Sequence, residues 1–215
     1  MPPTIAPTAV VCVGARVAGD VTIGAGTVVH PTAQIVAGDG ARPIVVGDNC
    51  VVEEMVVIRT SADAGDAGGE APPPLVIGGL NLFEVGCRLE DCASVGSCNV
   101  FEPKAVVPAG CAVANGVTVG TTVKLPAGVL VDDNSVVFMS GPDTAAGAGG
   151  RPGRRHQPRA QELNAKALAR YLQVLRDPAS RSCLTNFHKL QQGQGQGGDG
   201  GAAAAVPAAA AAATK

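Results

Sequence analysis

Few side chains in this sequence could do chemistry, and histidine is the first type to consider. His30 is the one histidine in the first 150 residues, because His156 and His188 lie much further along the chain. A zinc site needs three or four converging ligands, and general-base catalysis needs a histidine within a cleft. A single His30, followed directly by Pro31, therefore predicts an outward or corner residue. We expect no catalytic residue, no metal site and no cofactor.

The seven cysteines form no Cys-x-x-Cys pair, and their number is odd. Cys50, Cys87 and Cys111 share one position of a six-residue repeat where a small apolar side chain is expected. Cysteine in such a position behaves as a small hydrophobe. The pattern predicts reduced, buried thiols in a cytosolic protein, and it disfavours disulfides or a zinc site.

The repeat is clearest between Phe83 and Ala112. Every sixth residue there is large and apolar, and the residue four places later is small or carries an amide. The large positions are Phe83, Leu89, Val95, Phe101 and Val107, and the small positions are Cys87, Ala93, Asn99, Ala105 and Cys111. A period of six fits neither an amphipathic helix nor an ordinary sheet. It is typical of a parallel β-helix, whose repeats bury their apolar faces only by stacking.

The repeat extends from Ile5 to Val137 with two interruptions. Three hexapeptides make one triangular coil of eighteen residues, which predicts an all-β, left-handed parallel β-helix of about six to seven coils. We assign residues 1–141 to this prism. Two loops, at 36–45 and 59–76, should leave it from the same corner in consecutive coils.

Beyond the prism, the composition changes three times. Residues 142–157 are rich in glycine and arginine, which predicts a flexible basic linker. Residues 158–177 carry leucines at helical spacing, which predicts an amphipathic α-helix packed on the prism or capping its open end. Residues 178–215 should be irregular and then disordered, because they become a low-complexity tail.

Residues eighteen apart in this scheme should lie directly above one another. Asn81 and Asn99 then share an inward position and can bond from coil to coil, and Phe83 and Phe101 can stack. A glycine follows the large residue on the first side of four coils, where we expect a corner with positive φ. These glycines are Gly24, Gly47, Gly78 and Gly96.

On the second side of the prism, the position after the large residue is mostly acidic. It reads His30, Glu53, Glu84 and Glu102 in successive coils. This column either docks a basic surface of a partner or simply faces solvent. Arg154 and Arg155 belong to a basic cluster that could dock on the acidic body, grip a partner or lie in solvent. We treat these residues as candidate interaction residues.

Charge is divided unevenly along the chain, although the formal net charge is only −2. Residues 1–150 carry six basic and fifteen acidic residues, whereas residues 151–190 carry nine basic and two acidic ones. An acidic body repels phosphate, so nucleic acid is a disfavoured partner. No apolar run approaches the roughly 20 residues that span a bilayer, and the N-terminus lacks a secretion signal. We therefore expect a cytoplasmic protein without membrane insertion.

Several strings narrow the choice among β-helix proteins. The chain resembles the subunit-six family of dynactin, the multi-protein cofactor of cytoplasmic dynein, in IAPTAVVCV, AGDVTIGAGTVVHPTAQI, PIVVGDNCVVEE and VIGGLNLFEVGC. The resemblance covers about Ile5 to Gly141. It implies a non-catalytic, cytoskeleton-associated subunit of the pointed-end complex that acts in microtubule-based transport. The implied partners are dynactin subunit five, which is a second β-helix, and other pointed-end subunits including actin-related protein, with indirect links to dynein and cargo adaptors.

Three alternatives stay open on the sequence alone. They are a zinc-less γ-carbonic-anhydrase-like subunit of another complex, a trimeric hexapeptide acyltransferase, and a different β-helix subunit of dynactin. Metal content and native mass separate the first two from the rest, because a zinc-free chain that does not trimerise is neither.

Overall fold

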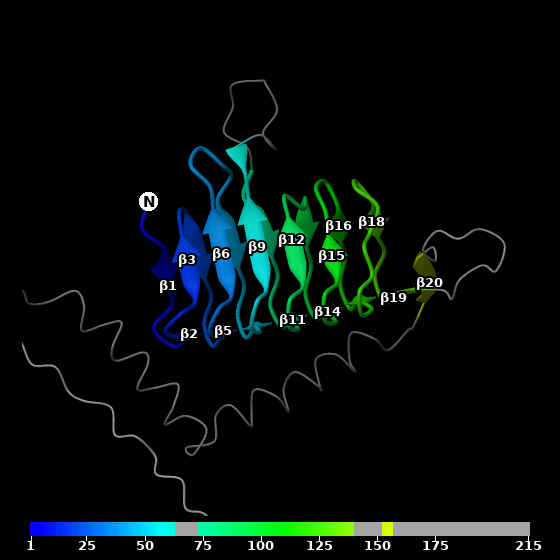
Figure 1. Ribbon diagram of the computed structural model, residues 1–215, viewed down its shortest axis with the longest axis horizontal. Coiled ribbons are helices and arrows are strands. Elements are labelled where there is room, and N and C mark those ends of the chain that lie inside the picture. The colour runs from blue at the N-terminus through cyan, green and yellow to red at the C-terminus, as the bar shows by residue number, and fades with distance from the viewer. Residues whose placement is uncertain (63–72, 140–151, 157–215) are drawn as a thin grey trace, which may run out of the picture.

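The chain winds into a three-sided prism of short parallel strands (Figure 1). The computed structural model describes residues 1–62, 73–139 and 152–156. Most strands of the prism hold only two or three residues, so a single coil cannot enclose a core. Successive coils stack on one another instead, and they bury the apolar residue that recurs at every sixth position. The fold is the left-handed parallel β-helix that the sequence predicts.

Three sheets form the sides of the prism. Sheet A consists of β1 (Thr4–Ile5), β4 (Val21–Ile23), β7 (Ile44–Val46), β10 (Leu75–Ile77), β13 (Ser94–Val95), β16 (Ala112–Val113) and β18 (Leu130–Val131). Sheet B consists of β2 (Val10–Val11), β5 (Val28–Val29), β8 (Val51–Val52), β11 (Leu82–Phe83), β14 (Val100–Phe101), β17 (Thr118–Val119), β19 (Ser135–Met139) and β20 (Pro152–His156). Sheet C consists of β3 (Arg16–Ala18), β6 (Gln34–Ala37), β9 (Val57–Thr60), β12 (Arg88–Glu90) and β15 (Val106–Val107).

Strand pairing follows the eighteen-residue coil. Phe83 pairs with Phe101, eighteen residues further along the chain. Across the two insertions, pairing still joins the predicted large positions, because Ile23 pairs with Val46 and Val46 with Ile77. The insertions are therefore accommodated at a corner and leave the register of the strands unchanged.

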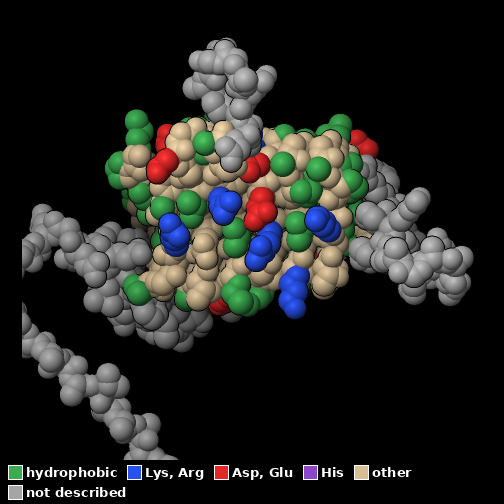
Figure 2. Space-filling view, turned by 45° about the horizontal axis from the view of Figure 1, so that its top comes forward, with side chains coloured by type: hydrophobic (Ala, Val, Ile, Leu, Met, Phe, Trp, Pro, Cys, Tyr) green, Lys and Arg blue, Asp and Glu red, His purple; other side chains and the backbone are tan. Residues whose placement is uncertain are grey.

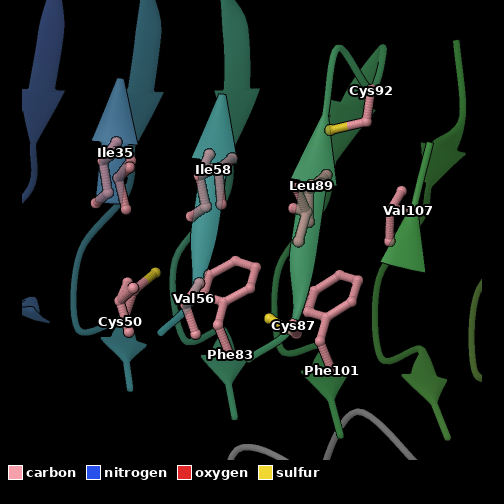
Figure 3. Close-up of a cluster of buried hydrophobic side chains, with 14 of the residues drawn as sticks. Ile35, Cys50, Val56, Ile58, Phe83, Cys87, Leu89, Cys92, Phe101 and Val107 are labelled. Carbon is pink, nitrogen blue, oxygen red and sulfur yellow. The ribbon is translucent and has the colours of Figure 1, made fainter. Parts of the chain in front are cut away.

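The interior of the prism is built from columns of side chains that run along its axis (Figure 3). Ile35, Ile58 and Leu89 lie one behind another on sheet C, and all three are fully buried. The rings of Phe83 and Phe101 stack in adjacent coils, with centroids 5.0 Å apart and planes inclined by 7°. Each core side chain thus contacts its counterparts in the coils before and after it.

A buried polar column runs through the same interior. The Oδ1 atom of Asn81 accepts the backbone N–H of Asn99 at 2.9 Å, and its Nδ2 donates to the carbonyls of Gly78 (2.7 Å) and Gly96 (2.8 Å). The Oδ1 atom of Asn99 accepts the N–H of Val117 at 2.7 Å. Three of these bonds join neighbouring coils and the bond to Gly78 lies within one coil, and all four run between a side-chain amide and the backbone.

The glycines at the corner between sheets A and B have a different role from the one expected. Among the described residues with positive φ, none of Gly24, Gly47, Gly78 and Gly96 is found. A Cβ atom on Gly47 would instead lie 2.6 Å from the carbonyl carbon of Gly78 in the next coil. The left-handed backbone occurs two residues later, for example at Asn49 with φ 54°. The positive-φ expectation is wrong, and glycine is needed because adjacent coils approach closely.

The two predicted loops, 36–45 and 59–76, are shorter than expected. β6 and β9 extend into their starts, and β7 and β10 extend into their ends. Pairing between strands continues past the last large side chain of each coil, as between Ala37 and Thr60. The backbone hydrogen bonds of the neighbouring coil therefore decide where each strand ends.

Both insertions leave the prism at the corner between sheets C and A (Figure 1). The hydroxyl of Thr60 donates to the carbonyl of Arg42 at 2.8 Å, and the N–H of Gly38 donates to the carbonyl of Thr60 at 3.0 Å. The bases of the two insertions are thus bonded to each other across consecutive coils. Residues 63–72 lie outside the described residues.

Residues 152–156 form β20, which pairs antiparallel with β19 on the last coil. The structure thus places a strand within the flexible linker expected over 142–157. The physical reason is the edge of β19, whose backbone groups accept an added strand whatever its side chains are. The helix expected at 158–177 and the tail at 178–215 lie outside the described residues.

Candidate interaction surface

A column of charged and polar side chains follows the strands of sheet B. Its members, one per coil, are His30, Glu53, Glu84 and Glu102, directly after β5, β8, β11 and β14. Backbone hydrogen bonds, such as that from Glu53 N–H to the Phe83 carbonyl at 2.9 Å, hold the column in register. All four residues are half-buried. The structure therefore aligns these predicted residues, and we call the three glutamates the acidic column.

Two carboxylates of the acidic column are hydrogen-bonded to the following coil. The Oε2 atom of Glu53 accepts the N–H of Val85 at 3.0 Å. The Oε2 atom of Glu102 accepts both the N–H and the hydroxyl of Thr121, each at 2.9 Å. Both side chains therefore lie along the prism and stabilise the turn of the next coil.

Glu84 lacks the equivalent donor. The residue at the corresponding place in the next coil is Pro103, which has no N–H. Burial of the carboxyl, followed by the charges of Glu53 and Glu102, raises the pKa of Glu84. Negative charge is therefore least compensated at the centre of the acidic column.

Replacing Glu84 with glutamine should stabilise the prism at neutral pH by roughly 0.3 kcal/mol, because a carboxylate between two others is removed. The folded-state pKa of Glu84 is raised, so its ionisation weakens the fold as pH rises through that pKa. The gain from Glu84→Gln should therefore be absent below about pH 4, where the unfolded chain is also protonated. Urea unfolding at several pH values measures it.

The matched control for that substitution is Glu90→Gln. Glu90 lies on sheet C with its Oε1 4.0 Å from Nη1 of Arg88, so its charge is compensated. Its replacement should not stabilise the protein. A gain from Glu84→Gln that is the same at acidic and neutral pH would contradict the charge repulsion in the column.

The side chain of His30 contacts a carboxylate. Its Nδ1 lies 3.1 Å from Oε1 of Glu54, and its side chain is only 14% exposed. A hydrogen bond to its own backbone and then the contact with His30 lower the pKa of Glu54, against the opposing effect of burial. Within the described ranges, no three His, Cys, Asp or Glu side chains are grouped so as to hold a metal ion. His30 thus fixes the turn after β5 to the next coil.

The cysteines of the described chain are packed as apolar side chains. Cys12, Cys50, Cys87, Cys92, Cys98 and Cys111 are all buried as thiols. Burial raises the pKa of Cys50 to about 11 and that of Cys92 to about 12. It also raises the pKa of Cys87, which lies beside the paired phenylalanines (Figure 3). Only a thiolate is a strong nucleophile, so the raised pKa values make Cys50, Cys87 and Cys92 poor nucleophiles at neutral pH.

The basic candidates Arg154 and Arg155 lie in β20. Their backbones pair with Val137 and Val136 of β19. The structure thus brings this basic segment to the same sheet as the acidic column, although at the far end of it. A role of the two arginines in binding stays a prediction.

A polar cluster at the corner between sheets C and A was not predicted from the sequence. The N–H and hydroxyl of Ser61 both donate to the carboxylate of Asp91, each at 2.7 Å. The guanidinium of Arg42 donates to the carbonyls of Cys92 and Ala93 in a later coil. These partners lie 30 or more residues apart in the chain, so only the coil geometry brings them together. The cluster fixes the base of the second insertion.

A basic surface was also not predicted. Exposed basic side chains lie on or beside the strands of sheet C, and we call this surface the basic face (Figure 2). Its members are Arg16, Arg59, Arg88 and Lys124. They are spread over more than 100 residues of sequence, and the signal that could have found them is their place beside the large residue of every third hexapeptide.

The architecture and its surface define the class of protein first. A continuous prism of hexapeptide coils, with thiols used for packing and a histidine bonded to a carboxylate, is a hexapeptide-repeat β-helix protein that presents charged flat sides. No helix in the described segments is long and apolar enough to cross a bilayer. Comparison of the sequence with models of known protein families finds no match.

Curated relatives define the family. The chain is 39% identical over 139 residues to dynactin subunit 6 of Danio rerio, covering 63% of this chain and 70% of the relative. It is 40% identical over 139 residues to dynactin subunit 6 of Xenopus tropicalis, covering 63% and 67%. It is 32% identical over 134 residues to that of Dictyostelium discoideum, covering 62% of each. The chain belongs to the dynactin subunit 6 family.

Two solved bacterial structures have a similar fold. A protein assigned as an acetyltransferase in Bacillus cereus superposes with a TM-score of 0.61 at 15% identity, covering 80% of this chain and 88% of that one. A hexapeptide transferase family protein from Anaplasma phagocytophilum gives 0.51 at 18% identity, covering 82% and 92%. At such identities the likeness concerns the β-helix fold alone.

Proposed function

We propose that the chain is a non-catalytic structural subunit of dynactin, placed in its pointed-end complex, where it supports dynein-dependent transport along microtubules. The observation that carries this proposal is the family membership, at 39% identity over 139 residues. The mechanism is geometric. Parallel coils spaced by about 4.8 Å form a rigid body with flat sides, and rigid flat sides suit packing against other subunits.

The partners in this proposal are subunit five, a second β-helix, and the other pointed-end subunits including actin-related protein. Contacts to dynein and cargo adaptors are indirect. The charged columns on sheets B and C support this arrangement, because complementary charge selects and orients protein partners. The protein would act in the cytoplasm as part of a cytoskeletal assembly.

An acyltransferase activity has less support. That chemistry needs a general base in a cleft, and His30 is the one histidine whose side chain the structure describes. Its Nδ1 is bonded to Glu54 and its Nε2 is buried, so neither ring nitrogen is accessible to a substrate. The transferase neighbours share the fold at 15–18% identity, which carries no activity over. We therefore propose no second function.

Capture of actin-related protein from cells that produce this chain tests the proposal. A copy of this chain that carries a tag for detection should elute with actin-related protein and subunit five at a constant ratio. The matched control is an unrelated hexapeptide-repeat protein with the same tag and expression level, which should be absent from the eluate. Isolation of the chain as a zinc-containing trimer without dynactin subunits would contradict the proposal.

A further inference from the structure

The basic face occupies one flat side of the prism. Arg16 lies on β3, Arg59 on β9 and Arg88 on β12, while Lys124 bridges to Val106 of β15. Each of these side chains is exposed, because each is next to a residue whose side chain points into the core. Figure 2 shows Lys and Arg side chains distributed across this side, with acidic atoms at its centre, and Glu90 is the register partner of Arg59 there.

This face is unusual for so acidic a body. Residues 1–139 contain six basic and fourteen acidic residues, yet four of the six basic ones lie on this one side. The guanidinium of Arg42 is turned to backbone carbonyls at the corner between sheets C and A. Lys104 is exposed in the turn that leads into β15. Residues 1–139 thus gather most of their positive charge on one side, although acidic residues outnumber basic ones there.

The charges of the basic face are largely uncompensated. The ion pair within the face joins Nη1 of Arg88 to Oε1 of Glu90 at 4.0 Å. Among the described residues, no carboxylate lies within ion-pair distance of Arg16, Arg59 or Lys124. Exposed like charges contribute nothing to the stability of the fold and raise its free energy slightly. Such a face is suited to a partner that supplies the missing negative charge.

The surface between the charges carries short apolar side chains beside the exposed Gln34. Val36, Val57 and Val106 are half-buried on the strands β6, β9 and β15. From β3 to Lys124 the face crosses five strand spacings, which is roughly 24 Å at 4.8 Å each. Apolar area framed by arginine is the usual composition of a protein interface. The face therefore combines the area, flatness and charge of a docking surface.

A protein partner fits this surface better than a phosphate polymer. The rest of the body is acidic and would repel the neighbouring phosphates of a nucleic acid. Single-stranded nucleic acid also needs aromatic side chains on which bases stack, but Phe83 and Phe101 are buried in the core and the exposed Phe138 lies on sheet B. A protein surface needs no base stacking, and its carboxylates can be confined to the area of the basic face.

We propose that sheet C docks an acidic side of a second β-helix subunit, and this proposal rests on the proposed function. A second β-helix repeats its surface side chains with the same strand spacing, so its acidic column can meet the basic face coil by coil. The acidic column of this chain shows that such a column is compatible with the fold. The inference specifies which side of the prism meets that partner and which charge the partner carries.

The test replaces Arg16 and Arg59 together with glutamine, which keeps most of each stem and removes two charges that no described carboxylate pairs. The control replaces Thr4 and Ser94 with glutamate. Both are exposed on sheet A, and the control changes the net charge by the same two units. Each variant is produced in cells and recovered through actin-related protein at increasing salt. Urea unfolding of the purified variants then checks that both variants remain folded.

The arginine variant should be retained at least about tenfold less than the unsubstituted chain, whereas the sheet A variant should be retained normally. Retention of the unsubstituted chain should also fall with added salt. Equal retention of both variants would overturn the docking face. Binding of poly(U) RNA by the isolated chain, lost in the arginine variant, would overturn the assignment to a protein. Absence of the unsubstituted chain from the eluate would instead contradict the proposed function itself.

Discussion

Replacing Gly47 with alanine should destabilise the folded chain by about 3 kcal/mol. The added Cβ would lie 2.6 Å from the carbonyl carbon of Gly78, 2.7 Å from the nitrogen of Gly79 and 2.8 Å from the carbonyl oxygen of Gly78. All three atoms belong to the backbone of the next coil, so no side chain can rotate to make room. The two coils must separate, and strand pairing between β7 and β10 on sheet A must weaken.

The matched control is Gly128→Ala. Gly128 has a φ of +68° and no heavy atom within 4 Å of an added Cβ, so alanine there meets only the cost of the left-handed backbone. That cost is about 1 kcal/mol. Urea unfolding followed by far-ultraviolet circular dichroism gives both losses in the free energy of unfolding. Equal losses would contradict the account of Gly47 as a point of close approach between coils.

Replacing Phe101 with alanine should lower the free energy of unfolding by about 4 kcal/mol. The ring is fully buried, and it stacks on Phe83 with centroids 5.0 Å apart. The strands on either side are fixed by hydrogen bonds to neighbouring coils, so the prism cannot contract to fill the cavity. Unfolding in urea, with the slope compared to that of the unsubstituted chain, measures the loss.

Two further substitutions separate the contributions at this site. Phe138→Ala removes a phenylalanine that is 38% exposed on β19, and it should cost much less than Phe101→Ala. The double variant Phe83→Ala with Phe101→Ala should lose less than the two single losses combined, because the stacking energy of about 1 kcal/mol is lost once. Strict additivity would mean that the two rings fill space independently.

Most of the fold was predictable because its period is fixed by geometry. A large residue at every sixth position identified the core columns, and pairing of Ile23 with Val46 and of Val46 with Ile77 follows that prediction across both insertions. The ends of the insertions were less predictable. Strand ends depend on hydrogen bonds to the neighbouring coil, and sequence periodicity carries no information on that pairing beyond the last large residue.

The glycine column illustrates a limit of reasoning from residue type. Glycine is used either for positive φ or for the absence of a side chain, and a single sequence does not distinguish these. Here the left-handed backbone falls on Asn49, Leu80 and Cys98, whereas Gly47 and Gly78 provide space. Distances to the next coil were needed to decide between the two uses.

The candidate site was predictable in part. The acidic column follows from the period, because one position of the hexapeptide is read three times on the same side. The uncompensated charge of Glu84 was harder to predict, because it depends on the absence of an N–H at Pro103 in the following coil. The basic face escaped prediction because its residues are separated by valine, glutamine and proline in the intervening coils and form no local run.

We propose above that this chain is a subunit of dynactin's pointed-end complex. Electron cryomicroscopy of dynactin purified from the cells that produce this chain tests that placement. We expect a three-sided prism with strands about 4.8 Å apart at the pointed end, beside a second β-helix, into which the side chains of this sequence fit. A map in which another protein fills that position, with this chain missing from the same preparation by mass spectrometry, would contradict the account.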